Sequence, residues 1–426
     1  MEISRREMLK ISGLGIGAAF MTKEALGQNS SSSSDQQLSP FYPGEALALD
    51  EMRITFCGTW YTPRMVQACN SVFVEIGGGE NGMPADQYVF DCGSGVVTKY
   101  VALGVPFSRM NKIFLTHLHG DHTSDLFHVY CFGPSSDRKT PLNIYGPSGD
   151  TPDEGTSYFC DNLYAMGKWH RESFSFLSTG YDPPEGGAGY NMQPGDGFDL
   201  FPTELPYMDN PGTAYSDPVN GVIITHFPAI HTRDGAISFK LEWNGLSMVF
   251  TGDTKPNNYV LEHAKGVDVL IHEMTAPADI WTTKETGLTN GQFYDEALAI
   301  NAEVIESSHT LQNALGYTLS QTNPRLAVAT HFPIDNDLIQ PAMRAIRCYY
   351  KGPVVIASDL MVINVSKSRI RHRMAVVKNK YPWYPHASFT GKLAASKYDG
   401  PLAQFNKELL ENIIPRTDYS KCSGGK

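Results

Sequence analysis

The sequence predicts an α/β fold in which helices cover a sandwich of two β-sheets. Three observations support this. Short apolar runs separated by Gly-rich turns fill the first half of the chain, strand-like and helix-like segments alternate in the second half, and a histidine-rich cluster directly follows one strand. A sheet must bury its apolar face, and helices that follow strands are placed to cover it. The length of 426 residues permits one elaborated domain or two.

The N-terminus carries the pattern of an export signal. Arg5 and Arg6 precede an apolar run, residues 11–21, that is rich in Gly and Ala and too short to span a bilayer. Residues 1–27 resemble a twin-arginine signal peptide, with an amphipathic N-terminal tail or an uncleaved anchor as the alternative. We therefore expect a periplasmic or secreted protein with no stable membrane anchor. Residues 28–50 begin with a Ser/Gln-rich stretch and are expected to form a flexible linker.

The first half of the folded part is rich in strands. Apolar runs predict strands at residues 53–57, 71–76, 87–90 and 112–115. Spaced apolar residues after an Asp-containing start predict a helix over 124–131. From 134 to 219 the pattern loosens into Gly, Pro, Asp and aromatic residues, with one helical stretch at 157–176. We interpret this part as an insertion over the active face.

Regular alternation returns near residue 221. Strands are predicted at 221–227, 236–243 and 246–250, and strand and helix pairs at 267–272, 310–321, 326–329 and 337–349. Strands followed by helices, twice over, imply a sandwich with helices on the outside. The folded domain is expected to span residues 51–366. A C-terminal extension, residues 367–426, follows it, and the sequence does not indicate its role.

The strongest functional signal is the run Thr116-His117-Leu118-His119-Gly120-Asp121-His122. It places three imidazoles and one carboxylate directly after a strand. His117 and His119 are two residues apart and project to one side of an extended segment, while Gly120 lets the chain turn. Borderline-soft divalent ions prefer imidazole nitrogen with some carboxylate oxygen. The sequence therefore predicts a metal centre rather than a polar loop that happens to be rich in histidine.

This H-x-H-x-D-H pattern resembles the signature of the metallo-β-lactamase superfamily, whose αββα sandwich binds up to two metals at one edge of its sheets. The resemblance extends from about residue 53 to 365. Three later segments match the remaining metal positions of the family in order: Ile230-His231-Thr232, Gly252-Asp253-Thr254 and Thr330-His331-Phe332.

The resemblance implies two divalent metal ions, expected to be zinc. One would be held by His117, His119 and His231, the other by Asp121, His122 and His331, with Asp253 between them. His226 is the alternative to His231 in the third position, and it is otherwise expected to line the pocket.

Within the superfamily the chain is most similar to the ribonuclease Z and arylsulfatase-like branch. Val269-Leu270-Ile271-His272-Glu273-Met274-Thr275 resembles its H-E-A-T segment, and Ser308-His309-Thr310-Leu311-Gln312-Asn313-Ala314 resembles its H-S-T-x-x-Q-A segment. In that branch the second segment supplies the histidine that protonates the leaving group. The resemblance thus implies His309 as general acid, with a packing role as the alternative, and Asp121 as the residue that orients the attacking water.

The substrate is expected to be a small ester. A net charge of −11 disfavours phosphate backbones, basic residues do not cluster with aromatic ones, and the K-x-R-N stretch of the RNA-processing enzymes is missing after the first strand. We expect hydrolysis of an aryl sulfate, phosphoester or lactone by hydroxide activated between the metals, with no nucleic-acid partner. A ribonuclease Z-like phosphodiesterase or endonuclease is the alternative, and a non-catalytic metal-binding protein is a distant third. Members of this branch often form homodimers. Loop residues that could favour an aryl leaving group, if they are not core residues, are Trp60, Tyr61, Tyr207, Met208, Phe227 and Phe332.

Overall fold

A computed structural model describes residues 39–179 and 195–377 of the chain. The expected signal peptide, residues 28–38 of the expected linker, part of the expected insertion and most of the expected C-terminal extension lie outside these residues. From residue 40 onward the described residues belong to one unit by their contacts. None of the described helices combines the length and the apolar character needed to cross a bilayer.

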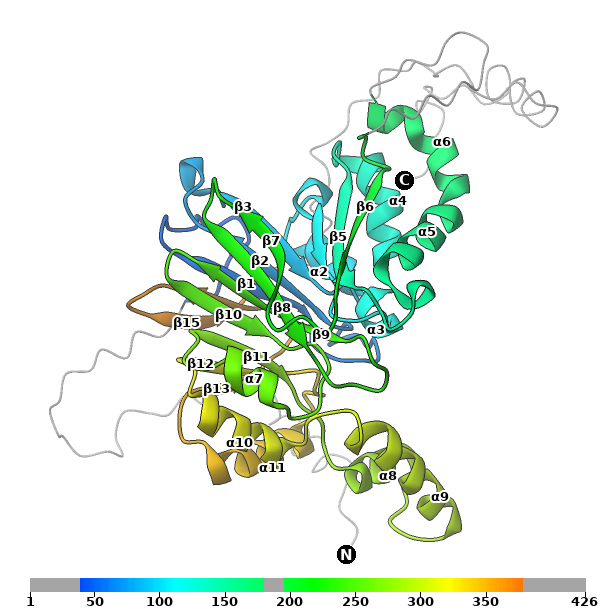
Figure 1. The fold of residues 1–426 in the computed structure, drawn as a ribbon. Coiled ribbons are helices and arrows are strands. Elements are labelled where there is room, and N and C mark those ends of the chain that lie inside the picture. Colours follow the sequence, from blue (N-terminus) through cyan, green and yellow to red (C-terminus); the bar gives the residue numbers. More distant parts are fainter. Residues whose placement is uncertain (1–38, 180–194, 378–426) are drawn as a thin grey trace, which may run out of the picture. The chain divides into compact units, whose positions relative to one another are not determined.

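The first sheet has eight strands in the order β15-β14-β1-β2-β3-β4-β5-β6 (Figure 1). Pairing is antiparallel from β15 to β3 and parallel from β3 to β6. The strands are β1 (Met52–Gly58), β2 (Ser71–Ile76), β3 (Asp86–Phe90), β4 (Lys112–Phe114), β5 (Leu142–Pro147), β6 (Leu200–Leu205), β14 (Met361–Val365) and β15 (Ile370–Met374).

The second sheet has seven strands in the order β13-β12-β11-β10-β9-β8-β7. Pairing is parallel from β13 to β10 and antiparallel from β10 to β7. The strands are β7 (Gly212–Asp217), β8 (Val222–Pro228), β9 (Ile237–Trp243), β10 (Leu246–Phe250), β11 (Val269–Glu273), β12 (Leu326–Thr330) and β13 (Val354–Ile356).

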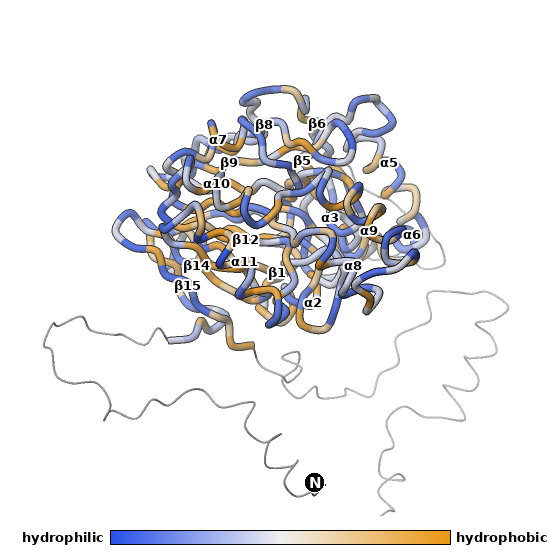
Figure 2. The backbone as a smooth tube through the Cα atoms, turned by 90° about the horizontal axis from the view of Figure 1, so that it is seen from below, coloured by the Kyte–Doolittle hydropathy of each residue, from blue (hydrophilic) through white to orange (hydrophobic). Residues whose placement is uncertain are grey.

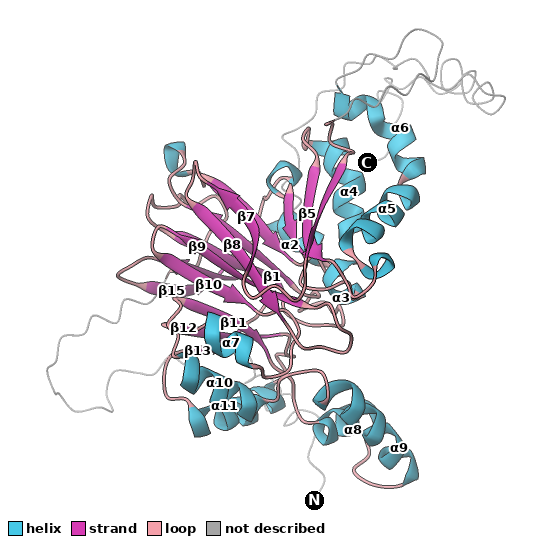
Figure 3. Cartoon of the chain, viewed as in Figure 1, coloured by secondary structure: helices cyan, strands magenta, loops and turns pink. Residues whose placement is uncertain are grey.

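Helices flank the two sheets (Figure 3). The group from the first half of the chain comprises α2 (Val96–Ala102), α3 (Gly120–Thr123), α4 (Leu126–Ser136), α5 (Thr156–Met166) and α6 (Lys168–Thr179). The group from the second half comprises α7 (Asn258–His263), α8 (Ala278–Thr286), α9 (Gln292–Asn301), α10 (Gln312–Thr322) and α11 (Asn336–Tyr349). Two sheets with helices outside them confirm the predicted fold class.

Three apolar clusters hold these layers together. The largest lies between the sheets, where the ring of Phe114 is 5.2 Å from that of Phe90 and 5.6 Å from that of Phe239, centroid to centroid. A second cluster joins the first sheet to α2, α4 and α5, and a third joins the second sheet to α7, α10 and α11. Figure 2 shows the apolar segments along the strands and the hydrophilic ones in peripheral loops. Burial of this apolar surface is the main force that fixes the layers.

Three strands lie in the part that we interpret as an insertion. β5 and β6 extend the first sheet, and β7 is the edge of the second. The sequence did not predict them because their patterns are weak: in β6 most residues are at least partly exposed, and Pro202 stands inside the strand. At the other end of the domain, β15 pairs with β14 beyond residue 366, and Phe41 bridges to Ala375. The domain boundaries stay a prediction.

Candidate metal centre

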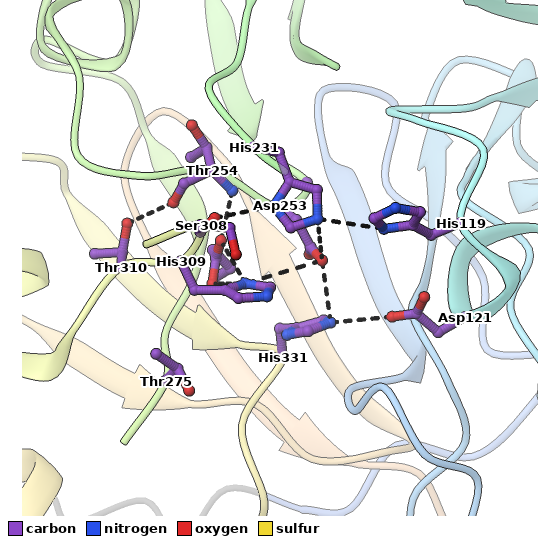
Figure 4. A network of polar contacts seen from close by, with 12 residues as sticks. His119, Asp121, His231, Asp253, Thr254, Thr275, Ser308, His309, Thr310 and His331 are labelled. Atoms are coloured by element: carbon purple, nitrogen blue, oxygen red, sulfur yellow. Dashed lines mark hydrogen bonds and ion pairs between the residues drawn. The ribbon is translucent and has the colours of Figure 1, made fainter. Parts of the chain in front are cut away.

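The predicted site residues follow the ends of strands that meet at one edge of the sandwich. The histidine cluster follows β4, His231 follows β8, Asp253 follows β10, and His331 follows β12. Turns with unusual backbone angles place Asp253 and His331. Gly252, directly before Asp253, has a φ of +58°, and a Cβ atom at this position would lie 2.5 Å from the Cβ of Thr116. His331 itself has a φ of +57°. Segments far apart in the sequence are therefore brought to one point (Figure 4).

The seven expected ligands form two sets. In each set the candidate ligand atoms lie within 4.8 Å of one another. The imidazole set consists of His117, His119 and His231, and the carboxylate set consists of Asp121, His122, Asp253 and His331. Asp253 also connects the sets, because its Oδ2 lies 3.9 Å from Nε2 of His117 and 3.4 Å from Nε2 of His331.

The protonation of the imidazole set and of Asp121 suits metal binding, whereas an ion at the carboxylate set must displace a proton from His122. Burial opposes the charge on His122, but the carboxylates around it raise its pKa well above the ordinary value. Burial lowers the pKa of all three histidines of the imidazole set, that of His231 to about 4, so each ring is neutral and has a lone pair to share. Burial opposes ionisation of Asp121, but His122 and His331 nevertheless hold the pKa of this carboxyl below its ordinary value. Neutral imidazoles and ionised carboxylates are the forms that bind divalent ions.

Two buried polar atoms at the centre test whether a cation fits. Nε2 of His122 and Oδ1 of Asp253 are buried and have no hydrogen-bond partner among the described residues. An unsatisfied buried polar atom is costly, and a cation between these atoms would satisfy both. The donor set, which is nitrogen with some carboxylate oxygen, fits divalent ions of borderline softness. The arrangement can therefore hold two divalent metal ions.

A buried carboxylate that the sequence did not predict orients His122. Asp91 directly follows β3 with a φ of +57°, which is rare for a residue other than glycine. Its Oδ2 lies 2.7 Å from Nδ1 of His122, and its Oδ1 accepts a hydrogen bond of 2.8 Å from the backbone N–H of Thr116. The bond from Nδ1 leaves Nε2 of His122 free to face the centre. A single Asp after a strand has no local sequence pattern that identifies it as functional. The signal that could have identified Asp91 is its position after a strand, which places a polar residue at the same sheet edge as the histidine cluster.

In the imidazole set, His231 is oriented by the backbone, whereas Nδ1 of His117 lies 3.1 Å from the hydroxyl oxygen of Thr116. Nδ1 of His231 donates to the carbonyl oxygen of Ser308, 2.9 Å away, and its Nε2 lies 3.3 Å from Nδ1 of His119. His226, the alternative in this position, lies in neither set. It is buried within β8, and its Nε2 lies 3.1 Å from the carbonyl oxygen of Pro206.

His309 borders both sets. Its ring centroid lies 4.8 Å from that of His231 and 5.4 Å from that of His331. Its Nδ1 lies 2.9 Å from Oε2 of Glu273, which is fully buried. Burial lowers the pKa of His309, but Glu273 outweighs it and raises that pKa to about 9. The ring is therefore protonated at neutral pH and can donate a proton.

The loop residues expected to line a substrate pocket divide into two groups. Phe227 and Phe332 are fully buried core residues, and Trp60 is packed against Trp281 with ring centroids 5.2 Å apart. Tyr61 is partly exposed, and its ring centroid lies 5.9 Å from that of His331. Tyr207 is partly buried and packs against the cluster between the sheets, with its hydroxyl donating to Asp150, whereas Met208 is exposed. Trp60 also lies near the ligand sets, because its ring centroid is 6.0 Å from that of His331. Among the six expected residues, Trp60 and Tyr61 are therefore the described ring neighbours of the ligand sets.

Comparisons with known proteins support the fold and the kind of enzyme. No protein-family model matches the chain. The chain is 24% identical to ribonuclease Z of Archaeoglobus fulgidus, over 74% of this chain and 98% of that protein. It is 27% identical to ribonuclease BN of Proteus mirabilis, over 54% of this chain and 78% of that protein. The metallo-β-lactamase fold protein YhfI of Bacillus subtilis superposes with a TM-score of 0.50 at 16% identity, over 74% of this chain and all of that one, and this likeness shows the fold.

These relatives correct the expected substrate and partner. Both sequence relatives are ribonucleases, which contradicts a small-molecule ester substrate and the absence of a nucleic-acid partner. The error came from the net charge of −11, which is a sum over the whole chain. Attraction of a phosphate depends on the local field, and bound divalent ions are often the largest charges in a site.

Proposed function

Because the chain belongs to the metallo-β-lactamase superfamily, in its ribonuclease Z branch, and is a hydrolase, we propose that it cleaves phosphodiester bonds of RNA. The observation that carries this proposal is the pair of ligand sets joined by Asp253, with a protonated histidine at their border. Pairs of divalent ions suit in-line displacement at phosphorus, where both the attacking and the leaving oxygen need a partner.

We assign one metal ion to each ligand set, and propose zinc for both. The imidazole set supplies three nitrogen ligands and leaves a position open, as catalytic zinc sites do. The carboxylate set supplies Asp121, His122 and His331, with Asp253 between the two positions. When bound, the two ions would supply a water of lowered pKa and neutralise charge on the phosphoryl oxygens.

Two residues of the chain would move or hold protons in the reaction. Asp121 is ionised and its carboxylate is partly exposed, so it can accept a hydrogen bond from the attacking water and orient it. His309 would donate its proton to the leaving ribose oxygen. Glu273 holds Nδ1 of His309, which orients the ring and keeps it protonated near neutral pH. Since alkoxides are poor leaving groups, this proton has a large effect on cleavage of RNA.

We also propose that the protein is exported. Arg5 and Arg6 before the apolar run support twin-arginine export, which carries proteins already folded with their metal. The substrate would then be RNA outside the cytoplasm. Replacement of both arginines by lysine should leave the protein in the cytoplasmic fraction, and unchanged periplasmic or secreted recovery would contradict export.

The proposed activity is tested with the zinc-loaded protein on two phosphodiesters, a single-stranded RNA oligonucleotide and bis(4-nitrophenyl) phosphate. We expect cleavage of both, and loss of both activities in His119→Ala. His372→Ala is the matched control, because this histidine lies exposed on β15. Failure of the loaded protein to cleave either compound, or equal activity in His119→Ala and the control, would overturn the proposal.

A further inference from the structure

A cavity of about 390 Å³ opens directly beside the imidazole set. One side is formed by His117, His119 and His231 themselves. The opposite wall comes from the loop after His231, from the turn Pro152–Glu154 and from the first turns of α5. A group bonded to a phosphate at the metal centre would therefore enter this cavity.

The opposite wall is acidic. It carries the carboxylates of Asp153, Glu154 and Asp234, and its one cationic side chain among the described residues is Arg233, which is ion-paired with Glu154. The hydroxyl of Thr151 donates to Asp153 over 2.7 Å and lowers the pKa of this carboxyl. Asp234 is exposed and has no hydrogen bond or ion pair to the described residues. Three carboxylates thus share one guanidinium on this wall, which leaves the wall with an excess of negative charge.

This charge distribution disfavours a negatively charged ligand group in the cavity and favours an uncharged one. Like charges repel, so a phosphate is disfavoured against the acidic wall, whereas bound divalent ions attract it at the ligand sets. The cavity therefore suits an uncharged group that donates hydrogen bonds. Asn162 adds to the acceptor character, because its amide nitrogen donates to the backbone of Tyr158 and its amide oxygen remains to accept.

The cavity also offers aromatic surface. Tyr158 and Phe159 lie next to each other in α5 and line the cavity, and Tyr158 has an exposed fraction of 52%. Flat aromatic groups of a ligand stack on such side chains, and this stacking depends little on which ring the ligand carries. An aromatic ring that carries hydrogen-bond donors, and no charge, matches both the stacking surface and the acceptors.

We propose that this cavity holds the nucleobase next to the scissile phosphate, that it selects a base with an exocyclic amino group, and that Asp234 accepts the hydrogen bond from that amino group. Tyr158 provides the stacking surface. This inference rests on the proposed cleavage of RNA and names the part of the substrate that the site selects.

Cytosine and uracil test the inference most directly. Cytosine carries an amino group at position 4, where uracil carries an oxygen, and uracil has one additional proton on the ring. A carboxylate accepts a hydrogen bond from the 4-amino group of cytosine and repels the 4-oxygen of uracil. We expect cleavage next to cytosine to be faster than next to uracil by about tenfold in kcat/KM, the effect typical of one such contact. Two oligonucleotide series, with the base varied on either side of the scissile bond, identify which side enters the cavity.

Asp234→Asn is the decisive variant, since its amide nitrogen can donate to the 4-oxygen of uracil. The preference for cytosine should fall to about onefold or reverse, while the metal content stays at the wild-type level, because Asp234 belongs to neither ligand set. Asp161→Asn is the matched control: Asp161 is exposed on α5 and does not line the cavity. It should keep the wild-type preference.

A binding measurement on metal-free protein is independent of turnover. Cytidine should bind more tightly than uridine in calorimetry or saturation-transfer NMR, and Tyr158→Ala should weaken cytidine binding by about tenfold or more through lost stacking. No cleavage of any phosphodiester by the loaded wild type would overturn the proposed function. Cleavage with equal rates next to cytosine and uracil, or a preference that survives in Asp234→Asn, would overturn this inference and leave the proposed function standing.

Discussion

One histidine of each ligand set, His122 and His231, differs in the group that orients it. In the carboxylate set, Nδ1 of His122 is held at 2.7 Å by the buried side chain of Asp91. In the imidazole set, Nδ1 of His231 is held at 2.9 Å by the backbone carbonyl of Ser308. The carboxylate set is also more deeply buried, whereas His119 of the imidazole set is exposed.

We interpret this difference as one between a metal site of high affinity and a metal site that is accessible to substrate. The carboxylate set brings two negative charges to its ion, and a charged partner behind His122 increases the basicity of the ring. The imidazole set is uncharged and borders the cavity that we assign to the substrate. We infer that the carboxylate set retains its ion more tightly and that the imidazole set is the side on which substrate enters. Mutations that act on one set, or on both, test this comparison.

The largest effect is expected for Asp253→Ala, because this residue contacts both sets. Loss of the shared carboxylate should remove the distinction between the sets by weakening both, so that the metal content falls well below two ions per chain. Activity on RNA and on bis(4-nitrophenyl) phosphate should fall by at least about a thousandfold, since the metals supply several kcal/mol of transition-state stabilisation. Elemental analysis and kcat/KM measure the two effects, with Asp161→Ala as control. A variant that keeps both ions and its activity would refute the role of Asp253.

His309→Gln should separate chemistry from metal binding. We expect cleavage of RNA to fall by about 10² to 10⁴-fold, the usual contribution of a general acid. Cleavage of bis(4-nitrophenyl) phosphate should change little, because nitrophenolate leaves without a proton. Metal content should stay at the wild-type level in both sets. Equal losses on the two substrates would show that His309 positions the site instead of protonating the leaving oxygen.

Asp91→Asn tests the comparison itself. The amide can no longer stabilise His122 as a carboxylate does, and loss of such a partner costs about 10 to 100-fold in metal affinity. Competition with a chelator should show the larger loss at the carboxylate set. The imidazole set should lose less, because Asp91 reaches it only through the hydroxyl of Thr116, which lies 3.1 Å from Nδ1 of His117. Circular dichroism checks that the variant folds, since Asp91 is fully buried. If both ions were weakened alike, the two sets would not be independent.

The sequence was sufficient for the fold class, and the seven residues that it singled out as ligands lie together in the structure, while their role as ligands stays a prediction. His117, His119, Asp121 and His122 lie within one short run after a strand, and the later three residues were identified because their segments resemble those of the family. The structure adds that Gly252, before Asp253, has a φ of +58°, which favours glycine. Local patterns of this kind can be recognised without knowledge of the tertiary structure.

Interactions between segments far apart in the chain could not be predicted from the sequence in the same way. Asp91 meets His122 only because β3 and β4 are neighbours in the first sheet. The acidic cavity wall combines the turn before α5 with the loop after β8, and neither segment has a pattern of its own. The substrate was predicted wrongly for a related reason, because net charge says nothing about where the charges gather in the fold.

The smallest effect is expected for His226→Gln, which probes the choice between His226 and His231. His226 lies within β8, is buried, and contacts the carbonyl oxygen of Pro206 and not the ligand sets. Its replacement should therefore leave the metal content and kcat/KM unchanged and lower the free energy of unfolding by about 1 kcal/mol, through the lost hydrogen bond. Urea unfolding measures this, and His231→Gln provides the contrast, with loss of metal from the imidazole set. Loss of an ion in His226→Gln, with the fold intact, would mean that the ring of His226 and not that of His231 completes the imidazole set.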